Sequence, residues 1–155
     1  MNRLTIFCDG LTEPTNPNGY GCCAFVVFEG RVSGRRGVPR PVPIHSQYGC
    51  IARPGEGITN NVCEYRAVRA ALRWLEQYDD EAHADIFTDS NLVVQQVNGV
   101  WDCHAPHLIP FRNECQNLLR DLPNASLRWV RRDENDVADA LTRIAYAEAS
   151  QERVA

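Results

Sequence analysis

The sequence predicts an α/β fold in which helices cover both faces of one mixed five-stranded sheet. Two observations predict it. The N-terminal third contains three strand-like runs and no helical pattern, and the rest of the chain alternates helical patterns with two further strand-like runs. Strands joined directly run antiparallel, whereas a strand that follows a crossover helix is parallel to its neighbour. We therefore expect three antiparallel strands followed by parallel ones.

The first half of the chain predicts three strands separated by turn-rich segments. Residues 4–8 form a short apolar run that ends at Asp9-Gly10, and residues 20–29 are rich in β-forming side chains. A third strand is expected within residues 45–52. The prolines, asparagines and glycines of residues 11–19 predict a turn, and residues 30–44 predict a loop that carries four arginines.

The second half predicts helices and two strands. A helix is expected over residues 61–78, because apolar side chains recur there at helical spacing, at Val62, Tyr65, Val68, Leu72 and Leu75. Strands are expected at 84–88 and 125–131, and helices at 91–97, 105–121 and 135–148. In the last helix, the side chains expected to face inward are Val137, Ala138, Leu141, Ile144 and Ala145.

Length and composition indicate one globular domain over residues 1–155, with its core in residues 4–145 and a flexible tail at the last few residues, from Ser150. No apolar run approaches the roughly 20 residues that a membrane helix needs. Seven cysteines without a C-x-x-C motif favour a reducing cytoplasm over a disulfide framework. We expect a cytoplasmic monomer that has no membrane partner.

The charge pattern is unusual because all 16 basic residues are arginine, although the formal net charge is −4. With a negative total, the field of the whole molecule does not indicate nucleic-acid binding. Arginine carries a planar donor group that matches phosphate, so local arginine patches remain able to grip a nucleic-acid backbone.

Four carboxylates stand where strands and helices are expected to meet. Asp9 and Asp89 follow strands, and Glu64 and Asp139 lie in the first turns of helices. Taken singly, each has a local explanation as a turn residue, a cap or an acid near a helix N-terminus. Brought together at one edge of an α/β sheet, they would repel one another, and a divalent cation such as Mg²⁺ would relieve that repulsion. We therefore favour a metal site.

Four motifs in order resemble type 1 ribonuclease H. They are "DG" at 9 with "NPNGYG" at 16–21, "TNNVCEY" at 59–65, "TDSNLVVQQVNGVW" at 88–101 and "WVRRDENDVADAL" at 129–141. The resemblance spans residues 4–145 and implies the ribonuclease H-like fold. It also implies an endonuclease that uses two Mg²⁺ ions, or Mn²⁺, to cut the RNA strand of an RNA/DNA hybrid, leaving 5′-phosphate and 3′-hydroxyl ends.

The same resemblance implies roles for individual residues. The matched metal ligands and catalytic residues are Asp9, Glu64, Asp89 and Asp139. The positions matched to contacts in the minor groove of the hybrid are Asn16, Asn60, Asn61 and Asn91. An amide side chain donates and accepts hydrogen bonds, which suits a 2′-hydroxyl and its neighbouring base edge. Each asparagine is also explained by a turn or a helix cap.

The sequence departs from the family pattern at two places. A histidine that many relatives carry before the last aspartate is absent, and Arg131-Arg132-Asp133-Glu134 fills a short connection there. A basic handle found in some relatives is also missing, since residues 99–112 hold only Arg112. We expect substrate phosphate to be contacted by Arg131, Arg132 or the arginines of residues 31–40.

Three alternatives stay open at this level. The fold can carry a non-catalytic module that binds hybrids or RNA, although four retained carboxylates argue against it. Another nuclease of the same superfamily is the second alternative. The third is a zinc protein, whose ligands would be Cys103, His104, His107 and Cys115, at a spacing that matches no standard zinc motif.

Overall fold

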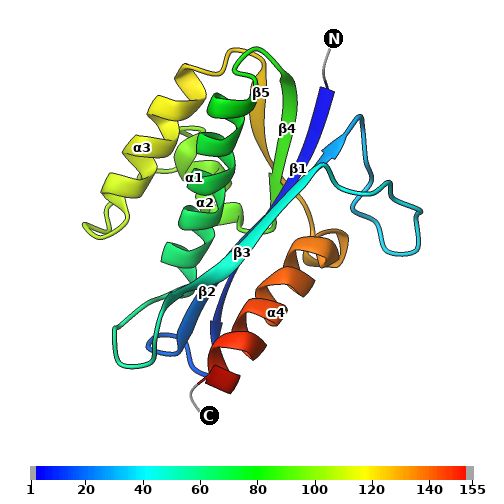
Figure 1. Cartoon of the computed structure of the whole chain (residues 1–155). Coiled ribbons are helices and arrows are strands. Elements are labelled where there is room, and N and C mark those ends of the chain that lie inside the picture. Colours follow the sequence, from blue (N-terminus) through cyan, green and yellow to red (C-terminus); the bar gives the residue numbers. More distant parts are fainter. Residues whose placement is uncertain (1–2, 153–155) are drawn as a thin grey trace.

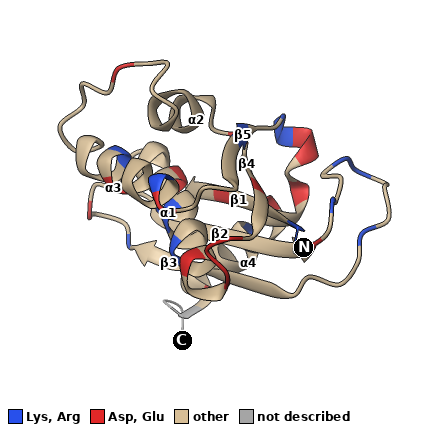
Figure 2. Ribbon diagram, turned by 90° about the horizontal axis from the view of Figure 1, so that it is seen from above, with Lys and Arg blue, Asp and Glu red and all other residues tan. Residues whose placement is uncertain are grey.

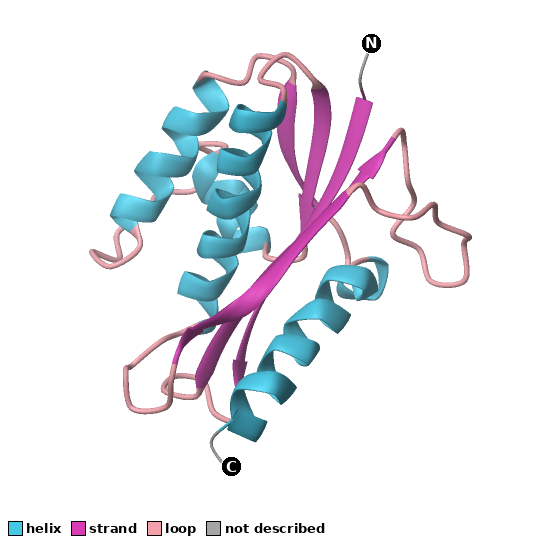
Figure 3. Ribbon diagram, in the orientation of Figure 1, coloured by secondary structure: helices cyan, strands magenta, loops and turns pink. Residues whose placement is uncertain are grey.

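A computed structural model describes residues 3–152 of the chain (Figures 1 and 3). Its elements are β1 Arg3–Glu13, β2 Tyr20–Glu29, β3 His45–Ala52, α1 Asn60–Tyr78, β4 His83–Thr88, α2 Asn91–Val97, α3 Ile109–Arg120, β5 Ala125–Trp129, the 3₁₀ turn η1 Arg132–Glu134, and α4 Asp136–Glu152. Within the described residues, no helix is both long and apolar enough to cross a membrane.

The five strands form one mixed sheet in the order β3-β2-β1-β4-β5. The ladders β1·β2 and β2·β3 are antiparallel, and β1·β4 and β4·β5 are parallel. This confirms the sheet predicted from the element order. β1 is the central strand, so it presents side chains to both faces of the sheet.

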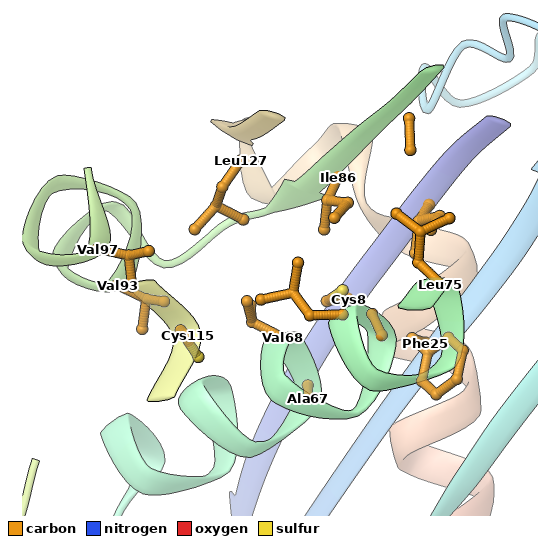
Figure 4. Packing of buried hydrophobic residues seen from close by; sticks show 14 of the residues in the cluster. Cys8, Phe25, Ala67, Val68, Leu75, Ile86, Val93, Val97, Cys115 and Leu127 are labelled. Atoms are coloured by element: carbon orange, nitrogen blue, oxygen red, sulfur yellow. The ribbon is translucent and has the colours of Figure 1, made fainter. Parts of the chain in front are cut away.

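Helices cover both faces, as predicted. α1, α2 and α3 lie on one face, and α4 crosses the other (Figures 1 and 3). Along β1 the side chains alternate: Leu4, Ile6 and Cys8 belong to the core under α1, whereas Phe7 packs with Ala138 of α4. Figure 4 shows the larger core, in which Cys8 lies among side chains from α1, α2 and α3. Each large apolar side chain buried there contributes about 1.5–3 kcal/mol.

The end of the first strand was predicted wrongly. β1 continues through the expected turn to Glu13, because its ladder with β2 runs unbroken from Leu4 opposite Glu29 to Glu13 opposite Tyr20. Gly10 therefore does not end the strand. It lies inside β1, where a Cβ would fall 2.5 Å from the backbone nitrogen of Glu64 and closer still to the carbonyl carbon of Cys63. The glycine lets β1 touch the first turn of α1.

Several other boundaries differ from the prediction. β5 ends at Trp129 rather than at residue 131, and α3 begins at Ile109 because residues 106–108 form a turn. α4 begins at Asp136 and continues to Glu152, so residues 150–152 are helical and not part of a tail. Residues 153–155 lie outside the described residues. Ile144 was expected to face inward but is 44% exposed, since it lies on the solvent side of α4.

Candidate active site at the end of β4

The site forms where β4 leaves the sheet. β4 pairs with β1 only as far as Thr88, which lies opposite Cys8. The next residue on each strand is a carboxylate, Asp9 on β1 and Asp89 after β4. Because β1 continues while β4 stops, the two side chains flank the opening at the carboxyl end of β4, a place where α/β sheets bind ligands. Asp9 itself lies inside β1, opposite Ala24, and not at a strand end.

Glu64 reaches the same opening from α1. The helix is capped by Thr59, whose side chain accepts a hydrogen bond from the backbone of Val62. Glu64 is thus one turn inside the helix and takes no part in a capping box. Its side chain is 9% exposed, and Thr88 donates a hydrogen bond to its Oε2 at 3.5 Å. This explains why a buried helix face carries a carboxylate.

Asp89 is not a helix cap. Ser90 caps α2, and its Oγ accepts from the backbone of Val93 at 3.3 Å. The backbone oxygen of Asp89 accepts from Nε1 of Trp129 at 3.2 Å, which fixes the end of β4 to the end of β5. The carboxylate is left to face the opening.

Three of the four predicted carboxylates come together. Ligand oxygens of Asp9, Glu64 and Asp89 all lie within 4.8 Å of one another, and Asp9 and Glu64 are buried. Asp139, in the first turn of α4, lies next to Asp9 and acts on its charge. Asp139 is more exposed and pairs with Arg143 at 3.0 Å, one turn later on the same helix.

The crowding of these carboxylates makes ionisation costly. Burial, and then the charges of Asp89 and Asp139, raise the pKa of Asp9 from 3.8 to about 8. Burial and the charges of Asp9 and Asp89 raise the pKa of Glu64 well above its usual value. Burial also raises the pKa of Asp89, against the opposing effects of Asn135 and Arg132. A group of oxygen donors held together at such cost has the chemistry of a site for a hard divalent cation.

Sequence reasoning missed three polar residues that hold the carboxylates in place. Asn135, 0% exposed just before α4, donates its amide to the backbone oxygen of Cys8 at 2.9 Å and also lowers the pKa of Asp89. Thr142 of α4 donates to the backbone oxygen of Asp139 at 2.6 Å, and its hydroxyl oxygen lies 3.5 Å from Oδ2 of Asp9; Thr88 donates to Glu64 as described. The only signal in the sequence was position: Asn135 and Thr142 lie one helical turn before and after Asp139, and Thr88 directly precedes Asp89, which is a common placement for polar residues.

The asparagines predicted to contact substrate fall into two groups. Asn16 and Asn60 lie together, since Oδ1 of Asn16 accepts from the backbone of Asn60 at 3.1 Å, and Asn61 is exposed beside them. Asn91 is exposed at the start of α2 and accepts from Gln95. Both groups lie at helix N-termini next to residues of the carboxylate cluster.

The two arginines predicted to contact phosphate follow β5. Both side chains are exposed, and Arg131 pairs with Asp133 at 3.1 Å. The positive charge of Arg132 partly opposes the rise in the pKa of Glu64 and of Asp89. The structure therefore brings Arg132 to the rim of the cluster.

The zinc alternative is wrong. Cys115 is fully buried in the core and Cys103 nearly so, whereas the side chain of His104 is 88% exposed. In residues 3–152, the His, Cys, Asp and Glu side chains close enough to share a metal are those of Asp9, Glu64 and Asp89.

Comparison with known proteins agrees with this geometry. Residues 45–145 match a family described as reverse transcriptase-like. The chain belongs to this family. Ribonuclease HI of Halobacterium salinarum is 35% identical over 124 residues, which cover 74% of this chain and 61% of that protein. A bifunctional protein of Mycobacterium tuberculosis is 34% identical over 102 residues, covering 63% of this chain and 26% of that protein. The chain thus spans less than two thirds of the first relative and about a quarter of the second.

Solved structures match over nearly the whole chain. The N-terminal RNase H domain of a Mycobacterium tuberculosis protein, fused to maltose binding protein, has a TM-score of 0.80 at 27% identity and covers 99% of both chains. RNase H1 of Halobacterium salinarum has a TM-score of 0.78 at 28% identity, covering 94% of this chain and 98% of that one. LC11-RNase H1 in complex with an RNA/DNA hybrid has a TM-score of 0.77 at 25% identity, with the same coverage. The resemblance to type 1 ribonuclease H is confirmed.

Proposed function

We propose that residues 1–155 form one catalytic domain that hydrolyses the RNA strand of RNA/DNA hybrids, leaving 5′-phosphate and 3′-hydroxyl ends. The observation that carries this proposal is the meeting of Asp9, Glu64 and Asp89 within 4.8 Å at the open end of β4. A module that only binds nucleic acid gains nothing from three carboxylates that repel one another and repel phosphate. A relative of the same fold, LC11-RNase H1, is described in complex with an RNA/DNA hybrid, which supports the substrate class.

The carboxylates fit a divalent metal centre, and we assign two Mg²⁺ ions to it, with Mn²⁺ as a substitute. Asp9, Glu64, Asp89 and Asp139 would hold the ions, because all four offer hard oxygen donors around one opening. When bound, such ions activate water and stabilise the leaving oxygen in phosphodiester hydrolysis. The protein itself fixes the position of Glu64. The backbone of Glu64 packs closely against Gly10, and the Thr88 hydroxyl donates a hydrogen bond to its carboxylate.

Substrate contacts in this proposal come from residues around the opening. The amide groups of Asn16, Asn60, Asn61 and Asn91 would meet the minor groove of the hybrid, where a 2′-hydroxyl distinguishes RNA from DNA. Arg131 and Arg132 would contact phosphate. The exposure of Asn61, Asn91 and both arginines supports their availability to a ligand. We also propose a monomer in a reducing compartment such as the cytoplasm, a location supported by seven free cysteines.

The test is cleavage of end-labelled RNA that is paired to DNA, paired to RNA, or single-stranded. Each substrate is incubated with Mg²⁺, with Mn²⁺ and with chelator, beside the variant Asp89→Asn. We expect internal cuts only in the hybrid, only with metal, and none with the variant. Tight hybrid binding without cleavage by the wild type would refute the enzyme and favour the binding module.

A further inference from the structure

The arginine-rich loop between β2 and β3, residues 30–44, is fixed against the site at two points. The first lies near its start. Val32 packs against the core beneath α4, and its backbone donates to Oγ1 of Thr5 at 3.1 Å. Gly34 lies so close to the backbone oxygen of Glu134, in η1, that a Cβ at this position would overlap it. The loop therefore touches the short connection that leads from β5 to α4.

The second point of attachment is an ion pair. Arg40 donates from Nη1 to Oδ1 of Asp136 at 3.0 Å and from Nη2 to Oδ2 at 3.4 Å. The two side chains are only 20% and 26% exposed, so the fork-shaped pair is shielded from solvent. Asp136 is the first residue of α4. This pair fixes the loop to the helix that carries Asp139.

Arg36 lies between the two attachments and faces a pocket. The pocket has a volume of about 480 Å³ and is lined by Arg36, Arg131, Arg132, Asp133, Asp136 and Asp139. Figure 2 shows the arginines of the loop beside the charged turn that follows β5. Asp139 is thus shared between the pocket wall and the carboxylate cluster. Arg35, the neighbour of Arg36, is exposed but does not line the pocket.

The carboxylates of this pocket already have arginine partners. These pairs are Asp133 with Arg131 at 3.1 Å, Asp136 with Arg40 at 3.0 Å and Asp139 with Arg143 at 3.0 Å. Arg36 reaches only the Asp136 carboxylate that Arg40 already holds, at 4.0 Å, and its side chain is 80% exposed. Among the described residues, no carboxylate lies within 4 Å of the Arg132 guanidinium. Two guanidinium groups therefore face the pocket with donors to spare.

We propose that Arg36, together with Arg132, binds a backbone phosphodiester of the cut strand beside the scissile one. The proposal rests on the proposed function, because it assumes that a nucleic-acid strand crosses the carboxylate cluster. A guanidinium presents a planar set of N–H donors that matches two phosphate oxygens. The loop thus offers the nucleic acid a positively charged contact. The rest of the protein offers few, since the net charge is −4 and residues 99–112 hold only one arginine.

The first experiment compares Arg36→Ala with Arg35→Ala as the matched control. Both are made in the Asp89→Asn background, so that a short RNA/DNA hybrid is bound and not cut. We expect Arg36→Ala to weaken binding about five- to tenfold, as for loss of one charged hydrogen bond at an exposed site. The magnitude of the slope of log affinity against log salt should fall by about one, because one phosphate contact is lost. An equal or larger effect of Arg35→Ala would overturn the assignment.

The second experiment locates the phosphate. Single uncharged methylphosphonate linkages are placed at successive positions of the cut strand, and the affinity of each hybrid is measured with and without Arg36→Ala. At one internal position next to the cut site, the linkage should lower the affinity of the protein that retains Arg36. It should not lower the affinity of the Arg36→Ala variant any further. The absence of any such position, while the unmodified hybrid still binds, would refute the pocket and leave the proposed function standing. Failure of every protein to bind the hybrid would refute the proposed function instead.

A third arm separates a backbone phosphate from a terminal one. The same proteins are measured on a hybrid whose RNA is already cut, with and without its 5′-phosphate. We expect the effect of Arg36→Ala to be the same for both. An effect that appears only with the 5′-phosphate would assign the pocket to the product end and overturn the backbone contact.

Discussion

Replacing Asp9 by asparagine should stabilise the metal-free protein while it abolishes hydrolysis. The change keeps the size of the side chain and removes its charge. Asp9 is 4% exposed, and burial together with the charges of Asp89 and Asp139 raises its pKa from 3.8 to about 8. An asparagine placed there carries no charge that the neighbouring carboxylates can repel.

The magnitude follows from the linkage between protonation and folding. The folded pKa of Asp9 is raised, so the folded protein binds more protons than the unfolded chain between pH 3.8 and about 8. The free energy of unfolding therefore falls as pH rises through this window. At pH 7 the interval above 3.8 corresponds to about 4 kcal/mol, at about 1.36 kcal/mol per pH unit. Water that enters the opening reduces this penalty, so we expect a gain of about 1–3 kcal/mol, or about 3–10 °C in Tm.

The assay is thermal unfolding in chelator from pH 4 to pH 8.5, for the wild type and Asp9→Asn. The difference in Tm should be small near pH 4 and grow toward pH 8. Asp80→Asn is the matched control, because Asp80 is exposed and makes no ion pair among the described residues, so it should show no such trend. Added Mg²⁺ should stabilise the wild type more than the variant, since binding to the folded state alone raises stability. An unchanged or lower Tm for Asp9→Asn at pH 8 in chelator would refute the view of Asp9 as one of several crowded, buried carboxylates.

Three further predictions concern the surroundings of the cluster. Gly10→Ala should lower stability by about 1–3 kcal/mol and reduce hydrolysis, because the new Cβ displaces the backbone at Glu64; full activity at unchanged Tm would show that α1 can move freely. Asn135→Ala should cost about 1–3 kcal/mol in denaturant unfolding, since it leaves the buried Cys8 carbonyl without its donor; a change within error would mean that water replaces the amide. Asp136→Asn should lower Tm at pH 7, and the difference should shrink as the pH falls below 3.8. The hydrogen bond and charge of Arg40 hold the pKa of the Asp136 carboxyl below its usual value, against the opposing effect of burial, so its stabilisation is lost as pH falls; a difference independent of pH would exclude the ion pair as the cause.

Much of the fold followed from local patterns. β2 and α2 were predicted with the bounds that the structure has, and α1 to within one residue, because alternation and helical spacing are strong over these segments. The four carboxylates were predicted to gather because each stands where a strand was expected to end or a helix to begin, and three of them do come together. The end of β1 was missed because Gly10 and the residues after it have the composition of a turn. A ladder of ten paired residues with β2 overrides that local preference.

What the sequence alone determined was the type and order of the elements, since each element depends on residues that are near one another in the chain, and it marked four carboxylates as candidates by their places at the expected ends of those elements. Only the tertiary structure decided which polar groups surround them. Asn135 reaches Cys8 across 127 positions of sequence, and Arg40 reaches Asp136 across 96. No spacing rule predicts such pairs, because they arise when β1, the β2–β3 loop and the start of α4 pack against one another. The crowding that raises the pKa of Asp9 has the same origin: β4 ends one residue short of it and leaves an opening into which three elements each place a carboxylate.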